Sequence, residues 1–191
     1  MKQAVSPQCS ISVIKIGGGL AAIPDALERV CRAVEEAARA ECIVVVPGGG
    51  RFADTVREFD RERGLSATAA HWMALLAMDQ YAFVLADRMS DAVLLEDPGS
   101  VPDVLAQNKV AVLAPSRWMR SADVLPHSWD VTSDSIAAFI AGALGATRLV
   151  LIKPVSSAGV DPCFAHTIPI GLPVSVLSWD RVETLAKELS G

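Results

Sequence analysis

The sequence predicts an α/β fold, in which helices cover both faces of a mostly parallel sheet to give a three-layer α/β/α sandwich. Two observations carry this prediction. Short apolar runs alternate along the chain with longer segments whose apolar residues recur every three or four positions. The apolar runs are continuous, as is typical of strands buried on both faces. No linker rich in Gly, Ser or Pro divides the 191 residues, so we expect a single domain, 1–191.

The first half of the chain shows this alternation from its start. The run at 11–17 is apolar and β-branched, which indicates a buried strand. Residues 24–40 place apolar residues at helical spacing on one face. The run at 42–50 repeats the pattern of a strand followed by glycines. A charged helix is expected around 55–63, and a longer, mostly apolar helix at about 68–88.

The second half continues in the same way, with apolar runs as strands and periodic segments as helices. Thr132 or Ser133 is the expected N-cap of one helix, because a hydroxyl there can accept a hydrogen bond from a free backbone N–H. Gly145 lies near the end of that helix, where glycine is favoured. The remaining strands are expected at 92–95, 109–115, 148–154 and 173–179, and the helices from near Pro102, at 133–146 and at 180–189.

Charge and composition restrict the partners. The net charge of −5 argues against a general nucleic-acid binder, which needs a basic excess or stripe. Residues 1–10 lack the features of a secretory signal, and no apolar run approaches the roughly 20 residues that cross a bilayer. The four cysteines form no C-x-x-C pair and complete no zinc pattern. We therefore expect a cytoplasmic protein that binds a small molecule and has neither nucleic-acid nor membrane partners.

Two runs of three glycines each follow a strand and precede a helix. In an open α/β sheet, ligands bind beyond the carboxyl ends of the strands. Loops without side chains bring backbone N–H groups close to phosphate oxygens at a helix N-terminus. The alternative is that each run is only a tight turn between a strand and a helix. Neither run fits the sequence fingerprint of a P-loop or of a dinucleotide-binding fold. The glycines are Gly17, Gly18 and Gly19 in the first run and Gly48, Gly49 and Gly50 in the second.

Lys15 distinguishes the first run, because it lies within the strand two residues before the glycines. Strand residues alternate between faces, so Lys15 is expected to point away from the face that Ile14 and Ile16 occupy. A charge within a buried strand is costly unless it is paired or reaches a ligand. The alternatives are therefore a ligand-binding lysine and a strand-end lysine that extends into solvent.

The ordered motifs resemble the amino acid kinase family. VIKIGGGL and VVVPGGGRFAD are similar to its first and second glycine motifs, and WDVTSDSIAAFIAGALGA to its third motif. RLVLIKPVSSAGVDP occupies the place of the strand and loop that contact the nucleotide. The resemblance runs from residue 11 to about 162 and implies an amino acid kinase-like fold. Two positions depart from the family pattern: many members have Ser at Gly19, and Lys153-Pro154 replaces the usual Thr-Asp.

The resemblance also implies an activity and its residues. It implies ATP and Mg²⁺, with no obligatory protein base when the acceptor is already an anion. Lys15 would stabilise the charge on the transferring phosphoryl group, and Asp134 would hold Lys15 in place. The first glycine run would bind the nucleotide phosphates, and the second would line the acceptor side. Lys153 would contact the nucleotide phosphates as a second catalytic cation, unless it is an exposed loop lysine.

Further candidates each keep a structural alternative. Asp130 and Asp134 bracket VTS, so one could assist magnesium or the acceptor, or both could only cap the helix. Asp161 faces the nucleotide or is a solvated loop carboxylate. Arg51, Arg117 and Arg120 hold an anionic acceptor or lie on the surface. His71 and Trp72 fall in the long apolar helix, where a packed core or a subunit interface is the favoured interpretation over a catalytic histidine.

Within the family, the short length and the segments PGGGRFAD, HWMALLAMDQ and WDVTSDSIAA most resemble the kinase branch linked to methanofuran biosynthesis. That resemblance implies transfer to (5-(aminomethyl)furan-3-yl)methyl phosphate, giving the diphosphate. Arg51 and the glycine amides could hold its phosphate, and Asp54 its ammonium group. Two alternatives stay open: a kinase of another small carboxylate or phosphate, such as uridylate, or a non-catalytic nucleotide- or oxyanion-binding protein of the same fold. The family resemblance implies a homodimer or higher homo-oligomer, for which the helix at 68–88 suits the interface.

Overall fold

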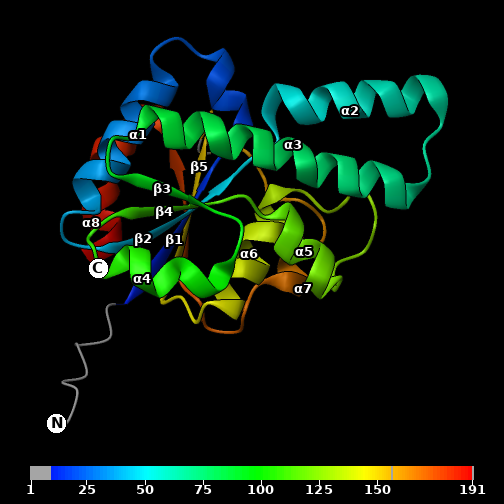
Figure 1. Ribbon diagram of the computed structural model, residues 1–191. Coiled ribbons are helices and arrows are strands. Elements are labelled where there is room, and N and C mark those ends of the chain that lie inside the picture. The colour runs from blue at the N-terminus through cyan, green and yellow to red at the C-terminus, as the bar shows by residue number, and fades with distance from the viewer. Residues whose placement is uncertain (1–9, 156, 191) are drawn as a thin grey trace, which may run out of the picture.

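A six-stranded sheet forms the centre of the computed structural model, which describes residues 10–155 and 157–190 (Figure 1). The strand order is β3-β4-β2-β1-β5-β6, and each of the five pairings between described strands is parallel. This confirms the expected α/β fold. The strands are β1 (Ile11–Ile16), β2 (Cys42–Pro47), β3 (Ala92–Leu95), β4 (Val110–Leu113), β5 (Arg148–Lys153) and β6 (Val174–Ser178).

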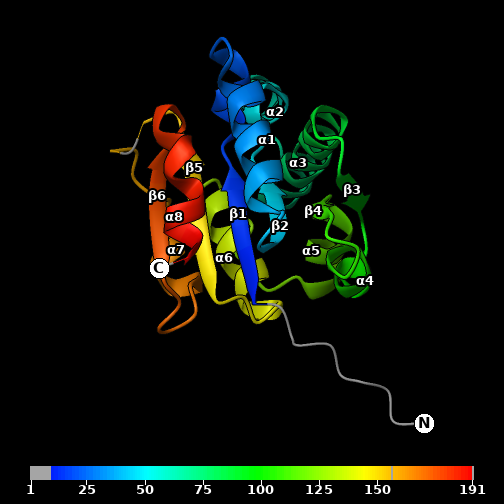
Figure 2. The same ribbon diagram turned by 90° about the vertical axis from the view of Figure 1, so that its left-hand side faces the viewer.

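Helices cover both faces of the sheet (Figure 2). One face packs on α1 and on the chain's last helical segments, and the other packs on α4, α6 and α7. The helices are α1 (Ala26–Ala37), α2 (Gly50–Arg63), α3 (Ala67–Arg88), α4 (Val101–Leu105), α5 (Ser116–Ala122), α6 (Ser133–Ala143), α7 (Phe164–Thr167) and α8 (Leu185–Ser190), with 3₁₀ turns η1 (Gly18–Ala22), η2 (Pro98–Ser100) and η3 (Trp179–Thr184).

The long helix α3 contributes to both apolar layers. Leu75 and Met78 near its middle pack with the α6 side, whereas Tyr81 and Leu85 further along pack with the α1 side. Figure 1 shows α2 lying along the first half of α3 and away from the sheet. No α2 residue is fully buried, in keeping with its charged sequence. The α2–α3 pair therefore forms a wall beside the carboxyl ends of the strands.

Three local expectations differ from the structure. The charged helix begins at Gly50, directly after the second glycine run, and not near residue 55. The last expected helix divides into η3 and α8. The short helices α5 and α7 were not predicted, because segments of seven and four residues are too short to show a helical period. No helix in the described ranges is both long and apolar enough to span a membrane.

Candidate active site

The carboxyl ends of β1 and β5 meet in the middle of the sheet, where the chain changes direction. The chain leaves β1 toward α1 on one face and leaves β5 toward α7 on the other. Such a switch point leaves a crevice that is the usual ligand site of an open parallel sheet. Lys15 is the next-to-last residue of β1, and Lys153 is the last residue of β5. Two lysines therefore stand side by side at this point.

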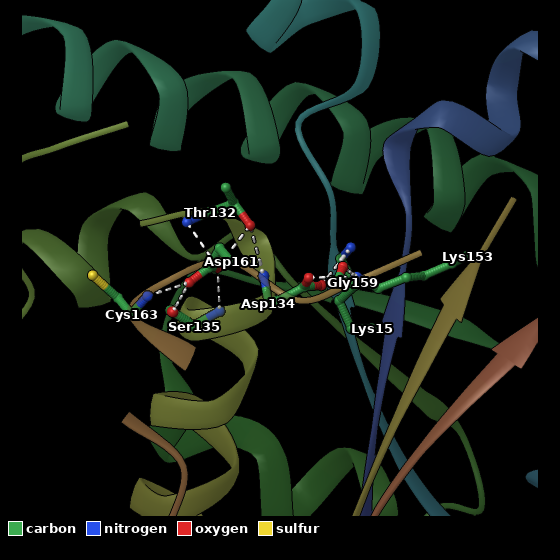
Figure 3. Close-up of polar contacts among 8 residues, drawn as sticks. All are labelled: Lys15, Thr132, Asp134, Ser135, Lys153, Gly159, Asp161 and Cys163. Atoms are coloured by element: carbon green, nitrogen blue, oxygen red, sulfur yellow. Dashed lines mark hydrogen bonds and ion pairs between the residues drawn. The ribbon is translucent and has the colours of Figure 1, made fainter. Parts of the chain in front are cut away.

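The two lysines share one carboxylate (Figure 3). Lys15 Nζ lies 2.9 Å from Asp134 Oδ1, and Lys153 Nζ donates to Asp134 Oδ2 at 2.6 Å. Lys153 Nζ also donates to the carbonyl oxygen of Gly159 at 2.6 Å. All three charged residues are buried, with 4–6% of their surface exposed. We call Lys15, Asp134 and Lys153 the lysine–aspartate cluster.

The local sequence explains how the cluster forms. Ile14 and Ile16 pack into the α1-side core, so the alternation of β1 turns Lys15 to the α6 side, as expected. Asp134 lies in the first turn of α6, and the Thr132 side chain caps that helix by accepting from Asp134 N at 3.4 Å. An anionic side chain is favourable at a helix N-terminus.

Burial and ion pairing both act on the pKa values of Lys15 and Asp134. Burial alone would raise the pKa of Asp134, but the ammonium groups of Lys15 and Lys153 outweigh it and hold that pKa below its usual range. Burial lowers the pKa of Lys15, and the attraction of Asp134 opposes this shift. A buried charge pair of this kind is retained at a cost in desolvation. Two cations on one carboxylate therefore suit an anionic ligand.

The two glycine runs touch each other beside the cluster. A Cβ atom added to Gly18 would lie 2.0 Å from the nitrogen of Gly50, and one added to Gly48 would lie 2.4 Å from the nitrogen of Gly18. Gly50 has a φ of +52°, which side chains disfavour. A Cβ added to Gly17 would lie 3.8 Å from Lys15 Nζ, so the first run adjoins the cluster. Gly18, Gly48 and Gly50 are therefore needed for the close packing of the two backbones.

A cavity of about 310 Å³ opens from the glycine runs. Gly18, Gly19, Gly49 and Gly50 line one end together with Thr132 and Ser133 at the start of α6. Leu75, Met78 and Ile136 give the cavity an apolar part of its wall. His71 and Trp129, which also border a neighbouring cavity, line the far part. Arg57 stacks on Trp129 there and lies 3.6 Å from Asp54, which also lines the cavity. The cavity therefore offers backbone amides and a helix N-terminus at one end, which is the arrangement that binds phosphate.

Comparison with known proteins assigns this arrangement to a family. A model of the amino acid kinase family matches residues 10–157. This chain belongs to the amino acid kinase family. The match covers both glycine runs and all three residues of the lysine–aspartate cluster.

A named relative within the family has a moderately similar sequence. It is 29% identical over 143 residues to (5-(aminomethyl)furan-3-yl)methyl phosphate kinase of Methanocaldococcus jannaschii. That match covers 75% of this chain and 65% of the relative, so the chain spans just under two thirds of the relative's length.

Two solved structures have a similar fold. The uridylate kinase of Archaeoglobus fulgidus superposes with a TM-score of 0.67 over 95% of this chain and 96% of that chain, at 15% identity. The UMP kinase of Ureaplasma parvum superposes with a TM-score of 0.59 over 75% of this chain and 68% of that chain, also at 15% identity. At this identity the likeness concerns the fold.

Asp161, expected on the nucleotide side, binds the protein itself. Its Oδ2 accepts from the backbone N–H and the hydroxyl of Thr132 at 3.0 and 2.8 Å, and from Ser135 N at 3.0 Å. Its Oδ1 accepts from the Ser135 hydroxyl and from Cys163 N, the latter at 3.1 Å. Asp161 thus ties the loop after β5 to the first turn of α6 (Figure 3). We infer that it positions Asp134 and the loop.

If Asp161 has this role, removal of its carboxylate should destabilise the fold. Replacing Asp161 by Ala should lower the free energy of unfolding by about 3 kcal/mol, because several buried donors lose their acceptor at once. Urea unfolding followed by circular dichroism measures the change. Asp87→Ala is the matched control, since Asp87 lies exposed at the end of α3. Equal stability of the Asp161 and Asp87 variants would refute the positioning role.

The remaining candidates lie further out. Asp130 is exposed and bonds to Ser128, and Arg51 is exposed and does not line the described part of the cavity. Arg117 lies 4.0 Å from Glu96 on the surface, and Arg120 stacks on Trp72 at 5.4 Å. None of these four side chains is gathered into the lysine–aspartate cluster.

Sequence reasoning missed two cavity residues. Arg57 follows Asp54 by one helical turn, and its guanidinium group stacks on Trp129 at 4.5 Å. Trp129 in turn donates from Nε1 to Asp60 at 2.7 Å. The presence of Trp immediately before Asp130 was the available signal, since aromatic residues in loops beside motifs often line binding sites.

Proposed function

We propose that the protein is a cytoplasmic, ATP- and Mg²⁺-dependent kinase that phosphorylates the phosphate of (5-(aminomethyl)furan-3-yl)methyl phosphate. Membership of the amino acid kinase family supports phosphoryl transfer. The name of the Methanocaldococcus relative supports this acceptor. The observation that carries the proposal is the lysine–aspartate cluster, in which two buried ammonium groups share one carboxylate beside two glycine runs.

The two lysines of the cluster have more N–H donors than the described protein acceptors use. Each ammonium group has three N–H donors. Within the described part of the chain, Lys15 contacts Asp134, and Lys153 donates to Asp134 and to Gly159. Two donors of Lys15 and one of Lys153 are thus left to bind a ligand. Phosphate oxygens suit these donors, because hydrogen bonds between charged groups are among the strongest.

The proposed transfer is a direct displacement at the γ-phosphorus. An oxygen of the acceptor phosphate attacks the γ-phosphorus, the bond from that phosphorus to the bridging oxygen breaks, and ADP leaves with the electron pair. The acceptor is already an anion, so no protein base has to remove a proton. Lys15 stabilises the charge that spreads over the γ-phosphoryl oxygens, as such transition states require. Lys153, on β5, holds the nucleotide phosphates from the other side.

Magnesium fits as a companion of the nucleotide. Among the described residues, no three His, Cys, Asp or Glu side chains gather in the way that a protein-held metal needs. The two oxygens of Asp134 are each in contact with a lysine. Mg²⁺ in kinases is held largely by substrate phosphates and water, with one or two carboxylates. When bound, Mg²⁺ would neutralise part of the phosphate charge.

An acceptor panel tests the proposed substrate. The protein is mixed with Mg-ATP and, separately, with the furan phosphate, UMP and a set of small carboxylates, and products are identified by mass spectrometry. We expect the furan diphosphate to form with a kcat/KM at least tenfold above that of any other acceptor. Saturable turnover of UMP alone would identify a uridylate-type kinase. ATP binding without any product would indicate a binding protein.

We also propose that the protein forms a homodimer through α3. Leu76 and Phe83, seven residues apart on this helix, are 50% and 60% exposed. Large apolar side chains exposed on one helix face favour association. Sedimentation velocity should show a dimer for the natural protein and a monomer for the double variant Leu76→Asp, Phe83→Asp. A monomer at all concentrations of the natural protein would overturn the proposal.

A further inference from the structure

A second cavity adjoins the first beyond its far part. It has a volume of about 340 Å³ and lies between the end of α2, the start of α3 and the loop before α6. The two cavities share His71, Ala74, Trp129 and Val131 in their walls. Asp60 and His127 line only the second cavity. His71 therefore stands in the wall that the two cavities share.

The His71 ring is fixed by its neighbours. It stacks on the ring of His127 at 4.6 Å with 19° between planes, and it meets the edge of Trp72 at 4.9 Å. His127 is held at both nitrogens, by the Thr68 hydroxyl at 3.0 Å and by an Asp123 oxygen at 2.8 Å. These contacts fix the plane of the His71 imidazole without using its nitrogens.

The nitrogens of His71 are the unexplained feature. His71 is 8% exposed, yet within the described ranges neither of its ring nitrogens makes a hydrogen bond to the protein. Neither nitrogen is among the fully buried, unpaired side-chain atoms of the described residues, so both stay accessible. A polar atom of this kind in a cavity wall is a typical ligand contact. Burial and the adjacent His127 lower the pKa of His71, while Asp123 opposes them. The neutral ring has one nitrogen that donates and one that accepts.

Charge is distributed unevenly along the cavity. The near end has the glycine amides and the N-terminus of α6, whose first turn carries Asp134 with its two lysine partners. The far part has the carboxylates of Asp54 and, across the shared wall, Asp60. The one arginine in the lining of the first cavity, as far as described, is Arg57, which stacks on Trp129 and lies 3.6 Å from Asp54. The cavity therefore suits a ligand with an anionic and a cationic end.

We propose that His71 is the specificity-determining residue for the end of the acceptor remote from the transferred phosphoryl group. Its unprotonated ring nitrogen accepts a hydrogen bond from a protonated amine on the acceptor, whose phosphate lies at the glycine runs. This assignment rests on the proposed function and deepens it. It makes His71 a substrate-binding residue, although its helix reads as core in the sequence.

Paired acceptors test the assignment. We compare the furan phosphate with (5-methylfuran-3-yl)methyl phosphate, which lacks the amine, in the natural protein and in His71→Phe. The Phe ring preserves the stacking on His127 but cannot accept a hydrogen bond. We expect KM for the aminomethyl acceptor to rise about ten- to a hundredfold, the cost of a lost bond to a charged group. KM for the methyl analogue and kcat for both should change less than threefold.

Two further variants separate binding from folding. His71→Gln, which keeps an accepting oxygen, should restore part of the affinity for the aminomethyl acceptor. His166→Phe, on the exposed side of α7, is the matched control and should change neither KM. Equal effects of His71→Phe on the two acceptors would overturn the assignment and leave the proposed function standing. If the natural protein phosphorylates neither acceptor, the proposed function and the assignment of His71 both fail.

The pH dependence gives an independent readout. Protonation of His71 removes its lone pair and places a cation against the ammonium group of the acceptor. The natural protein should therefore lose affinity for the aminomethyl acceptor, relative to the methyl analogue, as the pH falls below about 6.5, the ordinary pKa of histidine. The analogue corrects for titration of the acceptor phosphate and of His127, Asp123, Asp54 and Asp60 around the site. The same ratio in His71→Phe should be independent of pH; a pH-independent ratio in the natural protein would contradict the assignment.

Discussion

Lys15→Met is expected to lower kcat by about 10²–10³-fold, since removal of one preorganised donor to transition-state charge typically costs about 3–4 kcal/mol. Lys15 Nζ would lie 3.8 Å from a Cβ atom added to Gly17 in the first glycine run, where the γ-phosphoryl group is proposed to lie. Met fills nearly the same volume as the lysine stem, so the packing of β1 is preserved.

The same substitution should leave the fold intact. Removal of one partner usually destabilises a buried ion pair, because the other charge is left uncompensated. Here Asp134 keeps Lys153, so a one-to-one pair remains. Steady-state kinetics with Mg-ATP and the furan phosphate, together with thermal unfolding, measure both effects. Lys187→Met, on the exposed surface of α8, is the control. Unchanged kcat in Lys15→Met would remove Lys15 from the mechanism.

Gly18→Ala should abolish activity and lower stability together. The added Cβ would lie 2.0 Å from the nitrogen and 2.3 Å from the Cα of Gly50, and backbone atoms cannot rotate away as a side chain does. The two glycine loops must separate, which displaces the amides that would bind phosphate. Overpacking of this kind costs about 3 kcal/mol. In a chain of 191 residues, this corresponds to a Tm lowered by roughly 6–12 °C.

Gly19→Ala is the matched control for this steric argument. A Cβ at Gly19 would meet only the Pro154 side chain, at 3.4 Å, which is near ordinary contact distance. Its activity and Tm should stay close to those of the natural protein, measured by the transfer assay and by differential scanning calorimetry. Equal loss in the two variants would show that the site rejects any side chain in the loop, and that contact between the glycine runs is not the cause.

Much of this architecture could be predicted from local signals. Continuous apolar runs followed by glycines predict parallel strands and the edge at which they bind ligands. The position of Lys15 on the α6 side follows from strand alternation alone. Asp134 and Lys153 are 19 residues apart in the chain, and only their motif context suggested that they meet. The structure brings both to Lys15.

Other features depend on tertiary contacts that no local pattern records. In the sequence, Asp161 looks like an ordinary loop carboxylate. In the structure it accepts a hydrogen bond from Ser135 N in the first turn of α6, 26 residues earlier in the chain. His71 falls within an apolar helical repeat, so its burial was expected while its place in the cavity wall was not. Arg51 follows the second glycine run directly, yet the helix that begins at Gly50 turns it to solvent and brings Arg57 to the cavity.

One measurement tests the central claim most directly. Phosphorus NMR follows a mixture of the protein, Mg-ATP and (5-(aminomethyl)furan-3-yl)methyl phosphate, with a parallel sample of Lys15→Met. We predict that the acceptor's phosphate signal gives way to the two coupled signals of a diphosphate, one molecule for each ADP formed, and that the variant shows almost none. Saturable binding of ATP with no transfer to this or any other small anion would contradict the account.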